Sequence, residues 1–464
     1  MSGQGRHFDG GASGFPDDRN LDKMAARRRG GDRMRRVSWW RAMPICCALA
    51  AAIPLAAPAN AQDVVIARDV TVREQPRRRS RALEFPSIGT RLDLLDGGRQ
   101  VRGYYSVRLP DGRLGWVYRT FVRVVPEEGE PLVPPPPPPP GADQAILHFI
   151  DVDQGASALL EFPCGAVLVD AGVRGTAARA NLLDYLERFF ARRADLNRRL
   201  AAVFITHALS DHDNVLPDVA ERFGVGGFVF NGFTDARIEE MLQRATGSPP
   251  VAVERVEADD FAAGPARGFT NPVIDPLACE GTDPVIRVLA GGRERDPRWS
   301  AEEHRNPNNH SLVVRVDFGK ASLLVTGDLE LPGIEEVLAR HAGTRMLDVD
   351  VYAVGHHGAD DATTAAFLQA MSPDVAVISA GRHDTVRVPR SAWDHGHPRL
   401  SVVHLLESAI RRRRSPPVDM MLFDRQEGQP RRRPIKDAIY STSRDGDVRV
   451  IAGADGALIM ETSR

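Results

Sequence analysis

Two histidines and an aspartate lie close together in the segment 202–224, AVFITHALSDHDNVLPDVAERFG. A short apolar run at 203–205 is typical of a buried strand, and it stops just before Thr206 and His207. Asp211 and His212 follow in the same short loop, ahead of a helix-like pattern. Imidazole and carboxylate groups together are suitable ligands for borderline divalent ions such as zinc. The segment therefore predicts a metal site at the end of a strand.

Other strand-like runs also stop at titratable side chains. They end at Asp170, at Asp328 and at the pair His356-His357. Side chains at the ends of strands in a layered α/β domain meet at one edge of the sheets, where binding sites are commonly built. We therefore expect these residues to lie beside the histidines and the aspartate of the first segment.

An α/β domain is predicted from residue 145 onward, where strand and helix patterns alternate. Leucine and phenylalanine at helical spacing predict an amphipathic helix over 176–195, and a second helix is expected over 401–411. Strands are expected at 146–150, 158–162, 166–169, 203–205, 311–318, 321–325, 348–354 and 373–379.

The part of the chain before residue 145 has a different character. Residues 62–125 show short alternating strands separated by turn signals such as Asp111-Gly112, a pattern typical of a small all-β barrel. An unbroken proline run at 134–140 predicts a stiff polyproline spacer. The expected divisions are 1–61, 62–125, a linker at 126–144, and 145–464.

We interpret residues 1–61 as a disordered extension followed by a signal peptide. A basic start at 34–36, an apolar core at 45–55 and an Ala-Asn-Ala cleavage site at 59–61 carry this interpretation. The alternative is an uncleaved membrane anchor, although the apolar stretch is short and interrupted by proline. Cleavage would leave no transmembrane segment and predicts a periplasmic or secreted protein.

Two of the four cysteines lie within this leader, which leaves Cys164 and Cys279. They could pair in an oxidising compartment. Their separation along the chain says nothing about their distance in space.

Charge gives little direct indication of a partner. The chain of 464 residues has a formal net charge of -2, which shows no general attraction to nucleic acid or membrane surfaces. Arginine is clustered at 411–414 and 431–433. These clusters could bind phosphate groups, or they could be a solvated helix end and a solvated loop.

The motifs, taken in order, resemble the metallo-β-lactamase superfamily, and within it the ComEC-type competence-protein hydrolase domain and its soluble relatives. The resemblance covers residues 145 to about 450. It implies an αββα sandwich with one or two ions, zinc or manganese, at one edge of the sheets. The motifs are D-V-D-Q-G (151–155), V-D-A-G (169–172), T-H-A-L-S-D-H (206–212), N-N-H-S-L-V (308–313), T-G-D (326–328), G-H-H-G (355–358) and H-P (397–398).

Residues 62–125 resemble the bacterial SH3-like family in their V-T-V-R start at 70–73 and their D-G-x-x-G-W-V close at 111–117. This resemblance implies a targeting or binding module, in some relatives for the cell wall. A structural appendage without a ligand is the alternative.

The superfamily resemblance assigns ligand roles residue by residue. His207 would bind one ion, while Asp211 and His212 would bind the other. Asp328 would bridge the two ions, and either His356 or His357 would close the second site, with His357 preferred.

Three further residues have supporting or less certain roles in this resemblance. Asp170 would order the site through hydrogen bonds, so it joins Asp211 as a carboxylate with a role in catalysis. His310 lies near the place where many relatives supply another ligand. His397 begins an H-P pair that often borders the site.

The sequence departs from the family pattern at several places, among them residues 211–215, which replace the usual D-H-x-G-G. Leu209 stands where the middle ligand of the H-x-[HD]-x-D-H loop belongs, and leucine cannot coordinate a metal. Asp153 replaces the usual glycine of D-V-G-Q-G. The site nearest His207 therefore lacks a ligand unless His310 or another residue compensates. We expect one well-formed ion site at Asp211, His212, Asp328 and a histidine, with the other site weak or absent.

The predicted function is an exported metal-dependent hydrolase acting on phosphodiester or related bonds through a metal-activated water. The expected partner is a phosphodiester or small-molecule substrate, with nucleic acid among the candidates. The rival interpretation is a catalytically impaired binding protein at the cell envelope, which Leu209 favours. A peptidoglycan-associated hydrolase is a third reading, based on the SH3-like segment and export.

Overall fold

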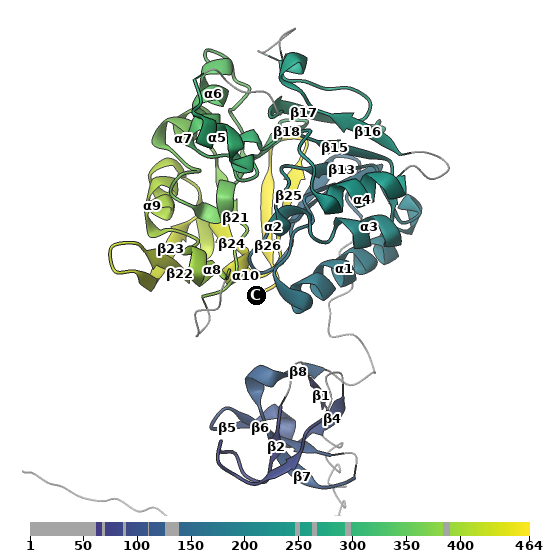
Figure 1. The fold of residues 1–464 in the computed structure, drawn as a ribbon, viewed down its shortest axis with the longest axis vertical. Helices are drawn as coiled ribbons and strands as arrows, with labels where there is room; N and C mark the ends of the chain where they lie inside the picture. The colour runs from purple at the N-terminus through teal and green to yellow at the C-terminus, as the bar shows by residue number, and fades with distance from the viewer. Residues whose placement is uncertain are drawn as a thin grey trace, which may run out of the picture. The chain divides into compact units, whose positions relative to one another are not determined.

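The computed structural model describes residues 62–66, 70–86, 90–109, 111–125, 139–245, 251–261, 267–292, 298–383 and 390–464. The chain divides into two compact units, Met1–Gly129 and Glu130–Arg464 (Figure 1). This boundary falls inside the segment 126–144 that the sequence predicts as a linker. The predicted leader and most of the proline run lie outside the described residues.

The N-terminal unit is all-β, with a small apolar core that includes Val64, Val107 and Val117. A hairpin joins β6 (Tyr104–Arg108) to β7 (Leu114–Tyr118), and Gly112 in its turn has the positive φ of +84° that an Asp-Gly turn requires. Its likeness to SH3-like domains stays a prediction. Among the described residues the strand order is β3 (Ala82–Glu84), β2 (Val72–Arg73), β7, β6, β4 (Arg91–Leu94), β1 (Gln62–Ile66) and β8 (Val122–Val125), with β5 (Gln100–Val101) paired to β6.

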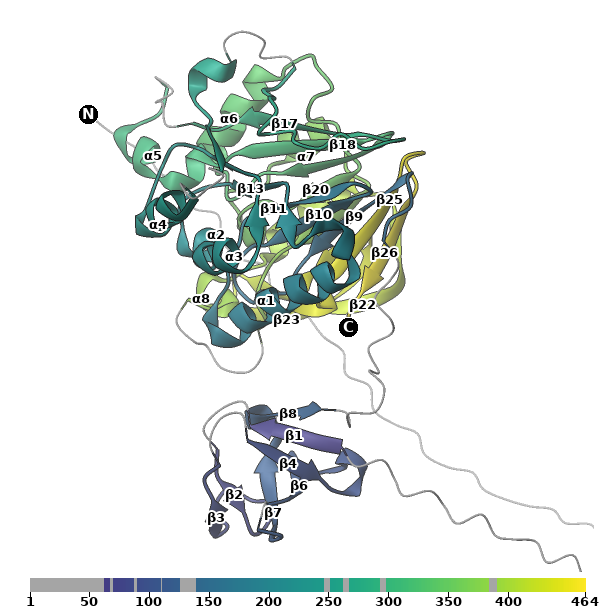
Figure 2. The same ribbon diagram turned by 90° about the vertical axis from the view of Figure 1, so that its right-hand side faces the viewer.

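The C-terminal unit contains two large β-sheets packed face to face (Figures 1 and 2). Among the described residues, the first sheet has the order β16 (Ala252–Arg255), β15 (Gly227–Phe230), β13 (Ala202–Ile205), β11 (Gly165–Val169), β10 (Ala158–Phe162), β9 (Gln144–Phe149), β25 (Val448–Gly453) and β26 (Leu458–Thr462). In the same part of the chain, the second sheet has the order β17 (Pro284–Ala290), β18 (Val313–Phe318), β19 (Ala321–Val325), β20 (Val351–Ala353), β21 (Val375–Ile378) and β24 (Ile439–Ser441).

Successive side chains along a strand point to opposite faces of its sheet, which explains why helices cover both outer faces of the sandwich. In β10, Leu160 and Phe162 belong to the core between the sheets, while Leu159 belongs to the core beneath the helices. Strands buried on both faces need a covering layer on each side. Helices α1 (Gly175–Arg192), α3 (Leu216–Arg222) and α4 (Ala236–Ala245) contribute to the core on the first sheet, and α6 (Leu331–Arg340), α7 (Ala365–Met371) and α9 (Leu400–Ala409) contribute to the core that includes the second sheet. The result is the αββα sandwich that the sequence predicts.

The observed elements agree with the periodicity of the sequence, apart from their ends and the arginine-rich segments. The predicted strand at 348–354 is shorter and spans Val351–Ala353, and Asp350 just before it accepts hydrogen bonds from the backbone and side chain of Ser322. The two arginine clusters lie on a two-stranded hairpin, β22 (Arg413–Asp424) and β23 (Gln429–Asp437), or directly before it. The first cluster therefore begins just after the end of α9, as the helix-end alternative has it, whereas 431–433 lie on a strand and not in a loop.

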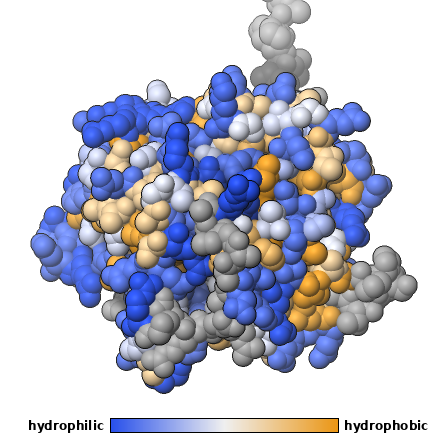
Figure 3. All heavy atoms as spheres, turned by 90° about the horizontal axis from the view of Figure 1, so that it is seen from above, coloured by the Kyte–Doolittle hydropathy of each residue, from blue (hydrophilic) through white to orange (hydrophobic). Residues whose placement is uncertain are grey.

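No helix within the described ranges is both long and apolar enough to cross a membrane. The face seen in Figure 3 is largely hydrophilic, with apolar side chains interspersed among polar ones.

A disulfide joins Cys164, in the turn between β10 and β11, to Cys279, in the segment that leads into β17. The bond therefore links the turn between two inner strands of the first sheet to the segment that precedes β17 of the second sheet. The pairing that the sequence left open is present in the structure.

Replacing both cysteines with serine should lower the free energy of unfolding by about 2–4 kcal/mol, because the bond restricts the unfolded chain across a long loop. Chemical denaturation of the oxidised protein and the double variant would measure this difference. Equal denaturation midpoints would contradict the disulfide.

Candidate metal centre

The predicted ligands gather at one edge of the sandwich, at the ends of strands from both sheets. Asp170 follows β11, and His207 lies shortly after β13 in the first sheet. Asp328 follows β19 of the second sheet. The pair His356-His357 lies in the 3₁₀ turn η6 (Gly355–Gly358), just beyond β20. Strand ends that are far apart in the sequence therefore place their polar side chains together.

The loop carrying Asp211 and His212 packs directly on the V-D-A-G turn. Both residues belong to the short helix α2 (Ser210–Asp213), which begins where the Leu209 carbonyl accepts hydrogen bonds from the backbone N–H groups of His212 and Asp213. A Cβ atom on Gly172 would lie 1.8 Å from the carbonyl oxygen of Asp211. Only glycine permits this approach, so the turn sets the position of the two ligands.

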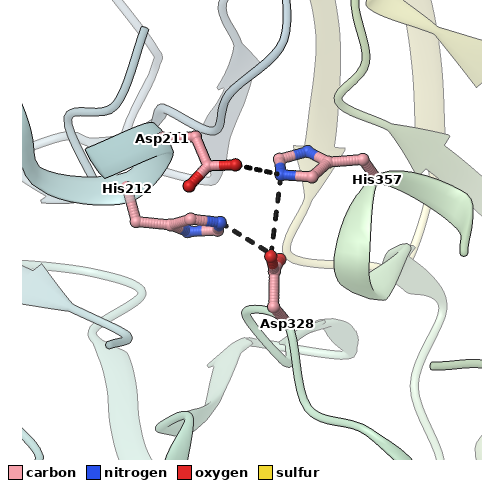
Figure 4. A group of neighbouring side chains, drawn as sticks. All are labelled: Asp211, His212, Asp328 and His357. Atoms are coloured by element: carbon pink, nitrogen blue, oxygen red, sulfur yellow. Dashed lines mark ion pairs between the residues drawn. The ribbon is translucent and has the colours of Figure 1, made fainter. Parts of the chain in front are cut away.

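Four side chains form a compact group around Asp328 (Figure 4). His212 Nε2 lies 3.1 Å from Asp328 Oδ1, and His357 Nε2 lies 3.7 Å from Asp328 Oδ2. His357 Nε2 is also 3.5 Å from Asp211 Oδ2. The candidate ligand atoms of all four residues lie within 4.8 Å of one another.

The hydrogen bonds of the two imidazoles leave their Nε2 atoms available to an ion. His212 Nδ1 lies 2.8 Å from Asp170 Oδ2, and His357 Nδ1 lies 2.8 Å from the carbonyl oxygen of Ser379. In a neutral ring whose Nδ1 carries the proton, Nε2 carries a lone pair. Both Nε2 atoms are buried and have no hydrogen-bond partner, although each faces the carboxylate of Asp328.

These residues fit a zinc-like ion. A lone pair that faces an ionised carboxylate in a buried site is unfavourable unless a cation lies between them. Ligand atoms about 2.0–2.1 Å from one ion are roughly 3.3 Å apart at the tetrahedral angle. The observed separations of 3.1 to 3.7 Å around Asp328, Asp211, His212 and His357 are close to that value.

Asp170 supports the site from beneath. Its Oδ1 accepts a hydrogen bond from the backbone N–H of Thr206, and its Oδ2 accepts from the Thr206 hydroxyl, both at 2.8 Å. The same Oδ2 faces His212 Nδ1. A carboxylate behind a histidine fixes the tautomer and orientation of the ring and increases its basicity. Asp170 is therefore placed to orient His212 and not to contact an ion directly.

The electrostatics of the apoprotein also favour a cation. Burial by itself would raise the pKa of Asp328, but the imidazoles of His212, His357 and His356 hold it well below the usual range. Burial would lower the pKa of His212, but Asp328 and Asp170 raise it well above its usual value. Protons on the imidazoles thus compensate the buried carboxylate, and a divalent ion can take over that role.

His207 and His356 also face Asp328, from opposite sheets. His207 Nε2 is 3.9 Å from Asp328 Oδ2, and His356 Nε2 is 3.8 Å from the same oxygen. Burial and the neighbouring His212 lower the pKa of His207 to about 3. The structure therefore brings both histidines of the G-H-H-G motif to the cluster, with His357 in the four-residue group.

His310 lies apart from this cluster. Its two ring nitrogens each lie 2.8 Å from a carbonyl oxygen, those of Gly292 and His304, and its ring packs against Trp299 and Phe233. Both nitrogens are thus engaged, so His310 cannot fill the gap left by Leu209.

His397 borders the cluster. Its ring stacks on that of His357, and its Nδ1 lies 3.4 Å from Gln154 Nε2.

Three residues near the site were missed by the sequence reasoning. Asp361 Oδ1 lies 3.1 Å from His356 Nδ1, and Glu330 Oε1 lies 3.8 Å from the same atom. Both acids stand close in sequence to a predicted ligand, which is a usable signal. Ser379 acts through its backbone carbonyl, so its side chain could not have indicated the role.

Asp170→Asn should weaken zinc binding about 10- to 100-fold, the usual cost of losing a carboxylate behind a histidine ligand. Asp211→Ala removes a ligand and should abolish stoichiometric binding. Calorimetric titration of the metal-stripped protein with zinc would measure both effects. His404→Ala is the control, because His404 is exposed on α9, and it should bind like the unaltered protein. Unchanged affinity in both aspartate variants would exclude this site.

A sequence model of the metallo-beta-lactamase superfamily matches residues 150–382 of this chain, about half of its length. ComE operon protein 3 of Bacillus subtilis is 28% identical over 211 residues, covering 45% of this chain and 22% of that protein. Competence protein ComA of Neisseria gonorrhoeae is 38% identical over 104 residues, covering 21% of this chain and 15% of that protein. The chain therefore matches less than a quarter of the length of these relatives.

Solved structures include the metallo-beta-lactamase fold protein YhfI from Bacillus subtilis, with 13% identity and a TM-score of 0.32, covering 57% of this chain and 94% of that one. The family match extends from the D-V-D-Q-G segment past the G-H-H-G turn, so it includes every ligand of the group around Asp328. The chain belongs to the metallo-beta-lactamase superfamily, whose members bind metal ions and are commonly metal-dependent hydrolases.

Proposed function

We propose that this protein is an exported metal-dependent hydrolase that cleaves phosphodiester or related bonds. The observation that carries the proposal is the pair of buried, unpartnered Nε2 atoms of His212 and His357 around the carboxylate of Asp328. Two imidazoles and two carboxylates suit zinc, and they also accept manganese.

The protein's own residues prepare this site for hydrolysis. An ion bound there supplies Lewis acidity and a water that ionises near neutral pH. Asp170 and the Ser379 carbonyl hold His212 and His357 with their Nε2 atoms toward that ion. Because Asp328 is almost fully buried, bulk water screens its charge weakly, which strengthens its hold on a cation.

Two observations support a phosphodiester as the substrate. One relative reported above is named as a competence protein, which favours nucleic acid. A pocket of about 800 Å³ is lined by Arg382 and by further basic side chains, and Arg382 follows soon after Ser379, whose carbonyl anchors His357. Arg382 is exposed and has no hydrogen-bond or ion-pair partner among the described residues. The further basic side chains of the pocket are His383, Arg432, Arg444 and Arg464.

The two arginine clusters provide fewer unpaired guanidinium groups for phosphate binding than their sequence suggests. Arg414 is buried in an ion pair with Asp445 and stacks on Tyr440. Arg433 pairs with Glu407. Most of these guanidinium groups are thus engaged in the hairpin and its neighbours, and we assign phosphate binding to Arg382 in their place.

The disulfide and the N-terminal unit support export to the periplasm or beyond. Disulfides form and persist mainly in oxidising compartments. The N-terminal unit has a pocket of about 1000 Å³ lined by Tyr104, Tyr118, Phe121 and several arginines. Tyrosine is enriched at interfaces because it combines a large apolar face with a polar hydroxyl, and we propose that this unit contacts the cell wall.

The alternative is a binding protein that retains the fold but has lost catalysis. Leu209 is the residue that favours it, since the second ion of a two-metal clamp then lacks a ligand. Metal binding without turnover is the result that this alternative predicts.

The purified mature protein should bind zinc or manganese and hydrolyse a generic bis-aryl phosphodiester. Asp211→Ala and removal of metal with a chelator should each abolish turnover, and re-addition of metal should restore it only in the unaltered protein. Release of the phenolate chromophore measures the rate. A metal-free protein inactive toward phosphodiester, ester and lactam substrates would rule out the enzyme. A metal-loaded but inactive protein would support the binding alternative.

Arg382→Ala should raise KM for an anionic phosphodiester about tenfold, a difference of ~1.4 kcal/mol, with little change in kcat. Arg411→Ala is the matched control, because Arg411 is also exposed and lies outside the pocket. Equal KM values for both variants would remove Arg382 from the substrate-binding surface.

A further inference from the structure

Asp328 faces imidazoles with both carboxylate oxygens, and its Oδ2 faces His357 of the four-residue group as well as two further histidines. His212 Nε2 faces Oδ1 at 3.1 Å. His207 Nε2 and His356 Nε2 face Oδ2, at 3.9 and 3.8 Å, and they approach it from different sheets. These two histidines lie outside the four-residue group that already fits one ion.

The His356 ring is held like those of the other ligands. Its Nδ1 lies 3.1 Å from Asp361 Oδ1 and 3.8 Å from Glu330 Oε1. A neutral imidazole that donates from Nδ1 to a carboxylate leaves a lone pair on Nε2, and this lone pair faces the anionic Asp328. Like His212, His356 can therefore compensate Asp328 either as a protonated ring or as a neutral ligand of a cation that lies between the two side chains.

His207 shows the same need from the opposite sheet. Its side chain is completely buried, and its Nε2 has no hydrogen-bond partner. Its Nδ1 lies near two hydroxyls, at 3.2 Å from Thr206 Oγ1 and 3.4 Å from Ser311 Oγ. Among the described residues, Asp328 is the acid that lies within ion-pair distance of this Nε2 atom.

The backbone of the G-H-H-G turn is strained in a way that this arrangement explains. His356 and His357 have φ values of +47° and +53°, in the left-handed region. Non-glycine residues there cost of order 1–3 kcal/mol each and persist where the surrounding structure requires them. These two consecutive left-handed residues bring the Nε2 atoms of His356 and His357 to 3.8 and 3.7 Å from Asp328 Oδ2.

We propose that His356 replaces the ligand missing at Leu209, so that His207, His356 and Asp328 hold a second ion beside the first. The proposal deepens the hydrolase function, on which it rests. Asp361 and Glu330 then act as positioning residues that hold the Nδ1 side of His356. The second ligand set is drawn from both sheets, because Leu209 leaves its own loop without a donor.

The surroundings of His356 favour the arrival of cations. Asp361 and Glu330 line a pocket of about 540 Å³ together with Glu302, Glu303 and Glu335. Among the described residues of this lining, Arg298 is the one basic side chain, so acidic groups predominate, and a net negative lining raises the local concentration of cations. This pocket therefore provides an acidic approach to the His356 side of the site.

A different arrangement would place the ion on the Nδ1 side of His356, between Glu330 and Asp361, whose ligand atoms also lie within 4.8 Å of one another. The carboxylate of Glu330 argues against it. Its two oxygens accept hydrogen bonds from the side-chain amides of Asn308 and Asn306, both at 2.8 Å. These neutral amides satisfy both oxygens of Glu330 as hydrogen-bond acceptors and fix its orientation, so Glu330 does not depend on an ion.

Counting zinc ions per chain by mass spectrometry, after equilibration with excess zinc and removal of free metal, tests the proposal. The unaltered full-length mature chain should hold two ions. His356→Asn and His207→Ala should each hold one. Asparagine is chosen at 356 because it tolerates the left-handed backbone of that position. His395→Ala, which alters a histidine near the site without facing Asp328, should keep two ions.

Two further variants distinguish an ion on the Nε2 side of His356 from an ion on its Nδ1 side. Asp361→Asn should retain two ions at saturating zinc but release the second one about 10- to 100-fold more readily. If the ion lies on the Nδ1 side, Asp361→Asn and Glu330→Gln will hold one ion while His207→Ala still holds two. That pattern would overturn the proposal.

Leu209→His separates failure of this proposal from failure of the hydrolase function. Two ions in both the unaltered protein and Leu209→His support His356 as the replacement ligand. One ion in the unaltered protein refutes the second site but leaves the first, and two in Leu209→His would then show an unfilled gap. An unaltered protein without any zinc would instead overturn the proposed function itself.

Discussion

The carboxylate of Asp328 is the group on which the rest of the site depends. It is buried, and an isolated buried charge of this kind is too costly to persist. Four imidazoles surround it: those of His207, His212, His356 and His357. Their Nε2 atoms all face Asp328, so the structure concentrates ligand lone pairs and negative charge at one point. A divalent cation can balance the charge of Asp328 and accept the Nε2 lone pairs at the same time, whereas a proton on one imidazole occupies only that ring.

The scaffold holds this arrangement because it is much larger and more rigid than the site. Two sheets with a continuous apolar core between them supply the strand ends that carry the ligands. Close backbone contacts, such as that of Gly172 with Asp211, fix the loops to one another. A packed interior tolerates strained residues such as His356 and His357, since relaxing them would disturb many contacts.

The surroundings of the G-H-H-G turn differ in charge on its two sides. His356 is anchored to Asp361, which lines an acidic pocket. His357 is anchored to the Ser379 carbonyl, close in sequence to Arg382 and its basic pocket. Cations and anionic substrates are therefore favoured by different surfaces near one cluster. The proposed hydrolysis of phosphodiesters requires both a cation and an anionic substrate, and this division of charge supports that proposal.

The sequence by itself determined the fold class, and its family resemblance pointed to most of the side chains that the structure gathers around Asp328. Strand periodicity in 158–169 and 203–205 and the motif order were sufficient, because buried strands and metal ligands depend on local residue types. It also identified Asp170 as a supporting residue. The family resemblance made His310 a candidate for the gap at Leu209, but its ring nitrogens face backbone carbonyls.

Only the tertiary structure decided which side chains share a point in space. The approach of His207 and His356 to the same oxygen of Asp328 joins strand ends from different sheets, and no local pattern reports such a distance. The partners of the arginine clusters and the anchor at Ser379 were likewise set by the packing of distant segments. Sequence patterns encode which residues can bind an ion, whereas the relative placement of two sheets decides which of them can bind it together.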